Sequence, residues 1–427
     1  MGMGLLQLLR KKNFFPLFCT QFFGAFNDNA YKLAMLTLIS YFLSSSQAQS
    51  ESYQAIAGGL FILPFFLFSA TAGQMADKFD KAHMTRILKW FEMLLMVIGG
   101  FGLYLGNVMI MMVILTGMGI HSTFFGPIKY AILPTHLPKR DLLGATALIE
   151  GSTFLAILLG TTLGTLSIGG PKGGAIYAIV LTCMAAIFGL IASLFIPPAS
   201  SKAKDLQIDW KLLRATWRML KDIVRNKRVI PALLAISWFW LIGTVILTKL
   251  PDYTNYVLNA ETSVFAVFLA LFSIGIAVGS LVISQLLKGE ITLKYVPHAM
   301  VILSIFACDI YWATPPAETR DSLQLLYEFF SQAAHIRVAV DLFFIAFSGG
   351  VFIVPLYTFL QVVSEEGFRA RTIAANNILN ALFMVAGTLL VMILLYFRIA
   401  IAEVFLILGI LNACAAAIYW YLFTKSA

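Results

Sequence analysis

The stretch Gln21–Leu33, QFFGAFNDNAYKL, places polar side chains inside an otherwise apolar segment. The apolar sequence NFFPLFCT precedes it and AMLTLISYFL follows it, so the segment extends from about residue 14 to residue 43. The hydrocarbon core of a bilayer needs roughly 20 apolar residues per helix, so this segment predicts a membrane-spanning helix. Near its middle lie Asn27, Asp28, Asn29 and Lys32.

A charge at the centre of a bilayer is costly unless it faces a partner or water. Asp28 and Lys32 are four residues apart, so they can pair on one face of a helix. We expect Asn27, Asp28 and Lys32 to line a functional site, and the alternative is a purely structural polar clasp.

The composition predicts a polytopic, all-α membrane protein. The 427 residues are 60% hydrophobic and only 12% charged, whereas soluble domains carry about 25% charged residues. Lipid cannot satisfy irregular backbone, so the spans are expected to be helices. The four cysteines are far apart in apolar runs. We therefore expect no disulfide framework, no metal site and no cofactor.

Twelve apolar segments are long enough to cross the membrane. They are about 14–43, 54–75, 84–105, 107–135, 141–168, 173–196, 229–257, 263–287, 295–313, 337–363, 371–397 and 399–424.

The Lys and Arg residues between these segments lie mainly on one side. With the N-terminus inside, 23 of the 30 Lys and Arg residues fall in cytoplasmic segments, including Lys425 and nine between Lys202 and Arg228. The cytoplasmic set also includes Lys78, Lys81, Arg86 and Lys89, around the junction of the second and third spans. The opposite side would carry only Lys172, Arg320, Arg337 and Arg398. Because positive loops stay inside, both termini are expected in the cytoplasm. The net charge of +9 then reflects topology rather than nucleic-acid binding.

The longest loop divides the chain into two halves of six spans. We expect an N-terminal bundle over 1–196, a cytoplasmic linker over 197–228 and a C-terminal bundle over 229–427. Within the linker, apolar residues recur at helical spacing from Ile208 to Val224, with Arg and Lys between them. This pattern predicts an amphipathic helix on the membrane face, either as a simple linker or with a lipid-binding or regulatory role.

The loop GQMADKFDKAHMTR, Gly73–Arg86, resembles a signature of the major facilitator superfamily. Gly73, Asp77, Lys78 and Lys81 match Gly-x-x-x-Asp-Arg/Lys-x-Gly-Arg/Lys, and Asp80 departs from it. We expect Gly73 to allow close helix packing and Asp77 to meet the positive N-terminal end of the helix near Arg371. Such a contact would hold the cytoplasmic side closed; the alternative is an ordinary basic turn. Two pseudo-symmetric six-helix bundles are also the architecture of this superfamily.

Other polar and aromatic residues fall inside predicted spans. These candidate substrate-binding residues are His121, Lys129, Glu150, Trp240, Lys249 and Tyr357, in addition to Asn27, Asp28 and Lys32. Lys129 and Glu150 are expected to pair across the fourth and fifth spans. A lone histidine such as His121 is more often a hydrogen-bonded helix residue than a proton relay.

Three stretches together resemble the bacterial lysophospholipid transporter family (LplT), a branch of the major facilitator superfamily. They are FFGAFNDNAYKL, FFGPIKYAILPTHLPKRDLLGATALIEGSTFLAILLGTTLG and AANNILNALFMVAGT. The resemblance implies that the protein moves lysophosphatidylethanolamine and lysophosphatidylglycerol to the inner leaflet of the Gram-negative inner membrane. It also implies a cytoplasmic acyltransferase and acyl-carrier-protein synthetase, separate or fused, that restores the second chain. A monomer in contact with membrane lipids is expected.

Two other functions remain open. A proton-coupled exporter of an amphipathic drug, siderophore or metabolite would use Asp28 or Glu150 as the proton carrier. A membrane scaffold for an acyltransferase would need no buried charge for transport. No catalytic constellation is evident, so the chain is not expected to be an enzyme.

Overall fold

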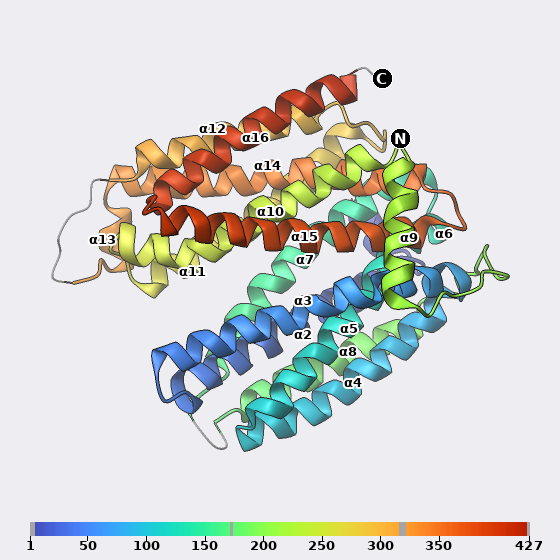
Figure 1. The fold of residues 1–427 in the computed structure, drawn as a ribbon, viewed down its shortest axis with the longest axis horizontal. Helices are drawn as coiled ribbons and strands as arrows, with labels where there is room; N and C mark the ends of the chain where they lie inside the picture. Colours follow the sequence, from blue (N-terminus) through green and yellow to red (C-terminus); the bar gives the residue numbers. More distant parts are fainter. Residues whose placement is uncertain (1–4, 171–173, 316–321, 425–427) are drawn as a thin grey trace. The chain divides into compact units, whose positions relative to one another are not determined.

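The computed structural model describes residues 5–170, 174–315 and 322–424, and these form helices joined by connecting segments (Figure 1). Eleven helices in these ranges are long and apolar enough to cross a membrane. The 24-residue helix α2, Phe15–Leu38, is about 36 Å long at 1.5 Å per residue. Its length suffices for a twelfth span, although it carries the polar residues of Gln21–Leu33. Lys172, Arg320 and Lys425, used in the charge count, lie outside the described residues.

The first compact unit comprises Met1–Ile230 and Leu360–Ile378. In Figure 1, α2 runs beside α7 and α8, and α3 runs beside α5. The helices of this unit are α1 (Leu5–Leu9), α2 with the π-helical turn η1 (Ile39–Leu43), α3 (Gln47–Lys78), α4 (Lys81–Leu105), α5 (Val108–Ala131), α6 (Leu133–His136), η2 (Lys139–Asp141), α7 (Leu142–Leu166), α8 (Ile176–Leu194) and α9 (Leu212–Arg225).

The second compact unit comprises Pro231–Phe359 and Leu379–Ala427. Its helices are α10 (Ile230–Asp252), the π-helical turn η3 (Tyr253–Val257), α11 (Thr262–Leu287), α12 (Val296–Ala313), α13 (Leu326–Phe330), α14 (Ala333–Val363), α15 (Arg369–Tyr396) and α16 (Ile401–Thr424). The end of α14 and the start of α15 belong to the first unit.

Short polar side chains set several helix boundaries. Ser46 accepts a hydrogen bond from the backbone N–H of Gln49 and caps α3, which therefore begins seven residues before the predicted span. Asp80 accepts from the N–H of His83 at 2.8 Å and starts α4. Gly106 ends α4 with φ of +63°, a conformation that favours glycine. The side chain of Asn107 then caps α5.

Glycines allow close helix contacts in both units. A Cβ atom at Gly160 or Gly164 of α7 would lie 2.4 Å from a backbone oxygen of α2. In the second unit, a Cβ at Gly279 of α11 would lie 2.0 Å from the backbone oxygen of Phe347 in α14. Small residues let helix backbones approach closely in membranes, where dispersion contacts replace the hydrophobic driving force.

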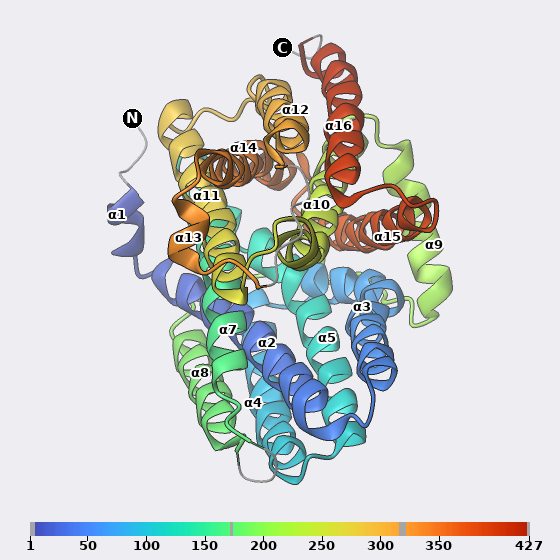
Figure 2. The ribbon, with the colours of Figure 1, turned by 90° about the vertical axis from the view of Figure 1, so that its left-hand side faces the viewer.

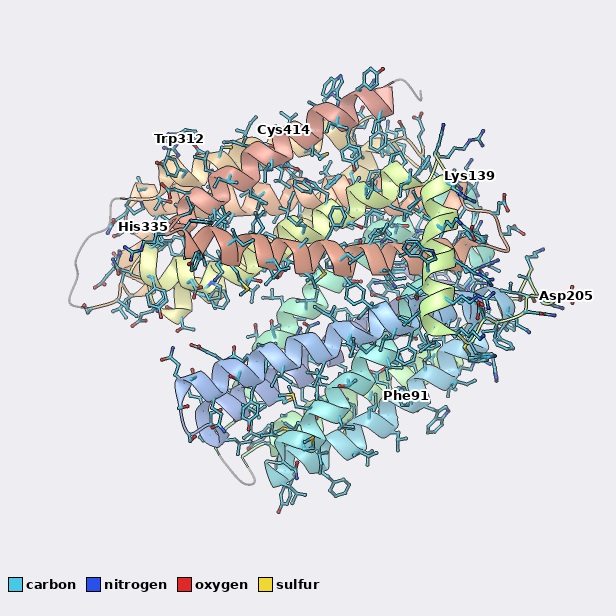
Figure 3. All side chains as sticks on the ribbon, viewed as in Figure 1. Phe91, Lys139, Asp205, Trp312, His335 and Cys414 are labelled. Atoms are coloured by element: carbon cyan, nitrogen blue, oxygen red, sulfur yellow. The ribbon has the colours of Figure 1, made fainter. Side chains whose placement is uncertain are left out.

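The helix surfaces carry many exposed apolar side chains. Among them are Phe101, Val113, Leu166 and Trp312, each more than 60% exposed, and Figure 3 shows Trp312 projecting outward from α12. Exposed apolar surface on this scale marks an interaction surface. With the apolar helices, it identifies a multi-pass membrane protein whose outer surface faces lipid.

Candidate functional site

The polar residues of α2 lie on different faces of that helix. Asn27 is fully buried and faces α4, where its Nδ2 donates to Glu92 Oε1 at 2.8 Å. Asp28 is half-buried and accepts from Ser122 Oγ of α5 at 2.5 Å. Because successive side chains point in different directions around a helix, Asn27 faces the interior of the unit and Asp28 lies nearer its edge.

Asn27 belongs to a buried network of charged and polar side chains. Lys89 Nζ and Glu92 Oε2 form an ion pair of 2.5 Å on α4, and His121 Nε2 lies 3.4 Å from the same Glu92 oxygen. Lys89, Glu92 and His121 are at most 2% exposed. Lys89, counted among the cytoplasmic basic residues, lies two turns into α4, which begins at Lys81, and it is buried. This network joins α2, α4 and α5, and the substrate-binding role of Asn27 and His121 stays a prediction.

Asp28 and Lys32 do not pair as expected. Within the described part of the chain no ion pair joins them, and Lys32 Nζ instead lies 5.5 Å from the centre of the Phe61 ring. Asp28 Oδ1 has no hydrogen-bond partner among the described residues. Asp28 Oδ1 is therefore a buried acceptor without a partner in the described structure, and Lys32 has its ammonium over an aromatic face.

Lys129 and Glu150 meet through Tyr130 rather than directly. Tyr130 OH donates a hydrogen bond to Glu150, and Lys129 Nζ lies 4.7 Å from the centre of the Tyr130 ring. No ion pair between Lys129 and Glu150 is found in the described ranges. The tyrosine satisfies the carboxylate and leaves the ammonium of Lys129 in a weaker cation–π contact.

These groups are distributed along the length of the first unit. On α2, Asp28 and Lys32 are about 6 Å apart along the axis, and Ser122 and Lys129 are about 10 Å apart on α5. Since Ser122 bonds Asp28, the order is Lys129, then Asp28, then Lys32. A row of two cations and one anion, with Glu150 beside Lys129, spans about 16 Å of depth.

The start of α15 is held by the carboxylate of Asp77. Asp77 accepts from Ala370 N at 2.9 Å, from Arg371 N at 3.2 Å and from Arg371 Nε at 3.0 Å. The contact expected at a helix N-terminus is thus formed, and Asp77 is 1% exposed. Lys81 is buried nearby, whereas Lys78 Nζ lies over the Phe79 ring at 5.9 Å. The gating role of these residues stays a prediction.

Gly73 lies at a close contact between α3 and α15. A Cβ there would meet Ala374 Cβ at 2.7 Å and Arg371 Cα at 2.9 Å. We expect Gly73→Ala to push the start of α15 off α3 and weaken the Asp77 contact, lowering transport and costing about 1–3 kcal/mol of stability. Gly58→Ala is the matched control, since a Cβ at Gly58 meets nothing within 4 Å. Equal transport rates and unfolding temperatures for the two variants would contradict this role of Gly73.

The candidate residues of the second unit form two separate contacts. Trp240 Nε1 donates to Tyr357 OH at 3.1 Å, and Lys249 pairs with Asp252 at 2.8 Å. Trp240, Lys249 and Tyr357 remain predicted binding residues. Sequence reasoning left Asp309 and Asp341 unplaced; Asp309 forms an ion pair with Arg337, and Asp341 is 1% exposed.

The sequence contains His136 and Asp141 at the His-x-x-x-x-Asp spacing that is typical of acyltransferase motifs, which the sequence analysis did not identify. In the structure Asp141 is buried and binds Lys11 Nζ at 2.9 Å, while His136 Nε2 lies 3.4 Å from Pro198 O. Both side chains thus have structural partners, and we assign them no catalytic role. No cluster of three or more potential metal ligands occurs among the described residues.

The model of the Major Facilitator Superfamily matches residues 17–319. The chain belongs to the major facilitator superfamily. Solved structures of other superfamily members share its fold. The human organic anion transporter TETRAN superposes with a TM-score of 0.75 at 13% identity, covering 95% of this chain and 99% of that one. The proton:xylose symporter XylE superposes with a TM-score of 0.71 at 13% identity, covering 98% of this chain and 96% of that one.

The resemblance to lysophospholipid transporters within the superfamily is confirmed by similarity over most of the chain. The lysophospholipid transporter LplT of Citrobacter koseri is 26% identical over 376 residues, which cover 86% of this chain and 84% of that protein. LplT of Photorhabdus laumondii is 28% identical over 359 residues, covering 80% and 78%. The similarity identifies the protein as a membrane transporter related to these bacterial proteins. Its described part contains twelve long helices.

Proposed function

We propose that this protein moves lysophospholipids, such as lysophosphatidylethanolamine and lysophosphatidylglycerol, to the inner leaflet of the bacterial inner membrane by alternating access. The observation that carries the proposal is the similarity to proteins named lysophospholipid transporter over 78–89% of their length. The row of charged groups in the first unit supports it, because it offers both signs of charge.

The head group of lysophosphatidylethanolamine carries an anionic phosphate and a cationic amine. In this proposal Lys32 and Lys129 attract the phosphate and Asp28 accepts from the amine through Oδ1, which lacks a partner in the described structure. Charge-assisted hydrogen bonds are the stronger class of such contacts. Lysophosphatidylglycerol would use the same lysines, with Asp28 accepting from glycerol hydroxyls.

The single acyl chain requires an apolar route. Moving it through water would cost about 0.8 kcal/mol per CH₂ group, so we propose that the tail stays partly in lipid while the head group passes along the row. The small residues of α7 that contact α2 at Gly160 and Gly164 provide a seam at which the two helices can separate.

The bias of Lys and Arg supports a topology with both termini in the cytoplasm. The Asp77 contact then lies on the cytoplasmic side and acts as a gate with Gly73, Lys78, Lys81 and Arg371. We further propose that the protein works as a monomer and delivers its substrate to a cytoplasmic acyltransferase and acyl-carrier-protein synthetase, and that it is not itself an enzyme.

A test of the proposal is leaflet exchange of fluorescent lysophosphatidylethanolamine in proteoliposomes. We expect exchange well above that of protein-free liposomes, without an imposed pH gradient, and much less exchange of a diacyl analogue. Exchange that occurs only with a proton gradient would favour the proton-coupled exporter, with Asp28 or Glu150 as the carrier. Absence of exchange under both conditions would contradict the proposal.

Lys129→Gln is expected to lower the exchange rate about 10-fold, because one charge-assisted hydrogen bond to the phosphate is lost. Lys139→Gln removes the same charge from an exposed position beyond the same helix and is expected to leave the rate unchanged. Equal rates for the two variants, measured at matched reconstitution levels, would remove Lys129 from the site.

A further inference from the structure

The linker helix α9 buries one face against α3. Ala215, Met219 and Ile223 are at most 5% exposed, and α9 packs against α3. Thr216 Oγ1 also donates to Phe66 O at 3.4 Å. The helix starts at Leu212, so Ile208, expected within its apolar pattern, precedes it. The buried face of α9 is therefore formed by Ala215, Met219 and Ile223, and Trp210 and Trp217 do not belong to it.

A second apolar face of α9 is uncovered in the structure. Leu213, Trp217 and Val224 are 74%, 72% and 59% exposed, and Trp210, just before the helix, is 66% exposed. At 3.6 residues per turn, positions 213, 217, 220 and 224 form one stripe on the helix. Trp217 lies in this stripe and Trp210 lies just before the helix, and exposed tryptophans are typical of the membrane–water boundary.

A basic stripe lies directly beside the uncovered apolar stripe. It comprises Arg214, Arg218, Lys221 and Arg225, all exposed. Arg218 contacts Asp209 at 3.3 Å, whereas the other three form no ion pair among the residues that the structure describes. Three free cations next to tryptophan and leucine match an anionic lipid head group above its acyl chain.

The helix α9 contacts α3 within the length of α3. Figures 1 and 2 show α9 crossing the direction of α3 rather than continuing it. Its contact at Phe66 is twelve residues before the end of α3 at Lys78, or about 18 Å along that helix. The contact of α9 with α3 therefore lies within the length of a candidate membrane span rather than beyond its end.

We propose that α9 is a docking surface for anionic diacyl phospholipids of the leaflet that it faces. Trp210, Leu213 and Trp217 enter the acyl boundary, and Arg214, Lys221 and Arg225 bind the lipid phosphates. This surface lies on the outside of the first unit and does not include the residues proposed to bind the transported lysolipid.

The test uses the full-length protein with its four cysteines replaced by serine, labelled with bimane at Trp217→Cys and reconstituted into nanodiscs. Quenching by brominated phosphatidylglycerol is compared with quenching by brominated phosphatidylcholine at equal mole fraction. We expect at least 2-fold stronger quenching by phosphatidylglycerol. A label at Asp222→Cys, an exposed position away from the apolar stripe, should be quenched weakly by both lipids.

Charge variants test the basic stripe. Arg214→Gln/Lys221→Gln/Arg225→Gln should remove the preference for phosphatidylglycerol, whereas Lys204→Gln/Lys227→Gln/Arg228→Gln, also exposed and basic, should retain it. Equal quenching of the original protein by both lipids would overturn the anionic-lipid assignment. So would absence of quenching at position 217, and disulfide-linked dimers of Leu213→Cys would then identify a second copy of the chain as the occupant.

Discussion

Asp28→Asn is expected to reduce the exchange of lysophosphatidylethanolamine about 10- to 100-fold. The substitution keeps the size of the side chain and its capacity to accept from Ser122 Oγ, which lies 2.5 Å from Asp28 Oδ2. It removes the negative charge that would attract the amine of the head group. The rate is measured in proteoliposomes after insertion and monodispersity have been matched to those of the unsubstituted protein.

Asn29→Ala is the matched control for this prediction. Asn29 is the next residue on α2, is also half-buried, and its Nδ2 donates to the backbone oxygen of Ala25. It makes no contact with the row of charged groups in the described structure, so its loss should change the rate little. If Asp28→Asn and Asn29→Ala exchanged lipid equally well, Asp28 would have no place in the substrate site.

Lys89→Met is expected to lower the free energy of unfolding by about 3–5 kcal/mol, because it leaves the Glu92 carboxylate buried without its cation. Lys89 and Glu92 are 0% and 1% exposed and 2.5 Å apart. The double variant Lys89→Met/Glu92→Gln should recover most of this loss, since it removes both charges and keeps an acceptor for Asn27. Unfolding in mixed micelles gives the three free energies.

Lys32→Met is compared with Lys89→Met to distinguish a lysine proposed to bind substrate from one that stabilises the fold. It also removes one lysine from the first unit, but the contact it removes is a cation–π contact with Phe61 at 5.5 Å, worth about 0.5–1 kcal/mol at exposed sites. We expect it to lower exchange and to leave stability nearly unchanged. For Lys89, additive effects of Lys89→Met and Glu92→Gln on the free energy of unfolding would contradict a structural network that joins the two residues.

The sequence was sufficient for the helix order because apolar length is a strong signal. The predicted span 107–135 corresponds to α5 and α6 over Val108–His136, and 263–287 corresponds to α11 over Thr262–Leu287. Helix ends were less predictable where polar residues continue a helix beyond the apolar run. The Gln and Ser residues after Ser46 form the first turns of α3, although they carry no apolar signal.

The site was only partly predictable, because side-chain contacts depend on the rotation of each helix. Sequence spacing permitted an Asp28–Lys32 pair, but α5 presents Ser122 to Asp28 and α3 presents Phe61 to Lys32. Lys89 was counted with the cytoplasmic basic residues, although it falls within the predicted span 84–105. The Lys89–Glu92 spacing of three residues on α4 was the available signal for a buried pair.

The most direct test of the central claim is to locate the head group on the chain. A lysophosphatidylethanolamine analogue with a photoreactive group on its head would be crosslinked to the protein in proteoliposomes and mapped by mass spectrometry. We expect labelled peptides from α2, α5 and α7 around Asp28, Lys129 and Glu150, with labelling reduced by unlabelled lysolipid and by Asp28→Asn. Labelling confined to lipid-exposed surfaces, and insensitive to both, would contradict a head-group site in the first unit.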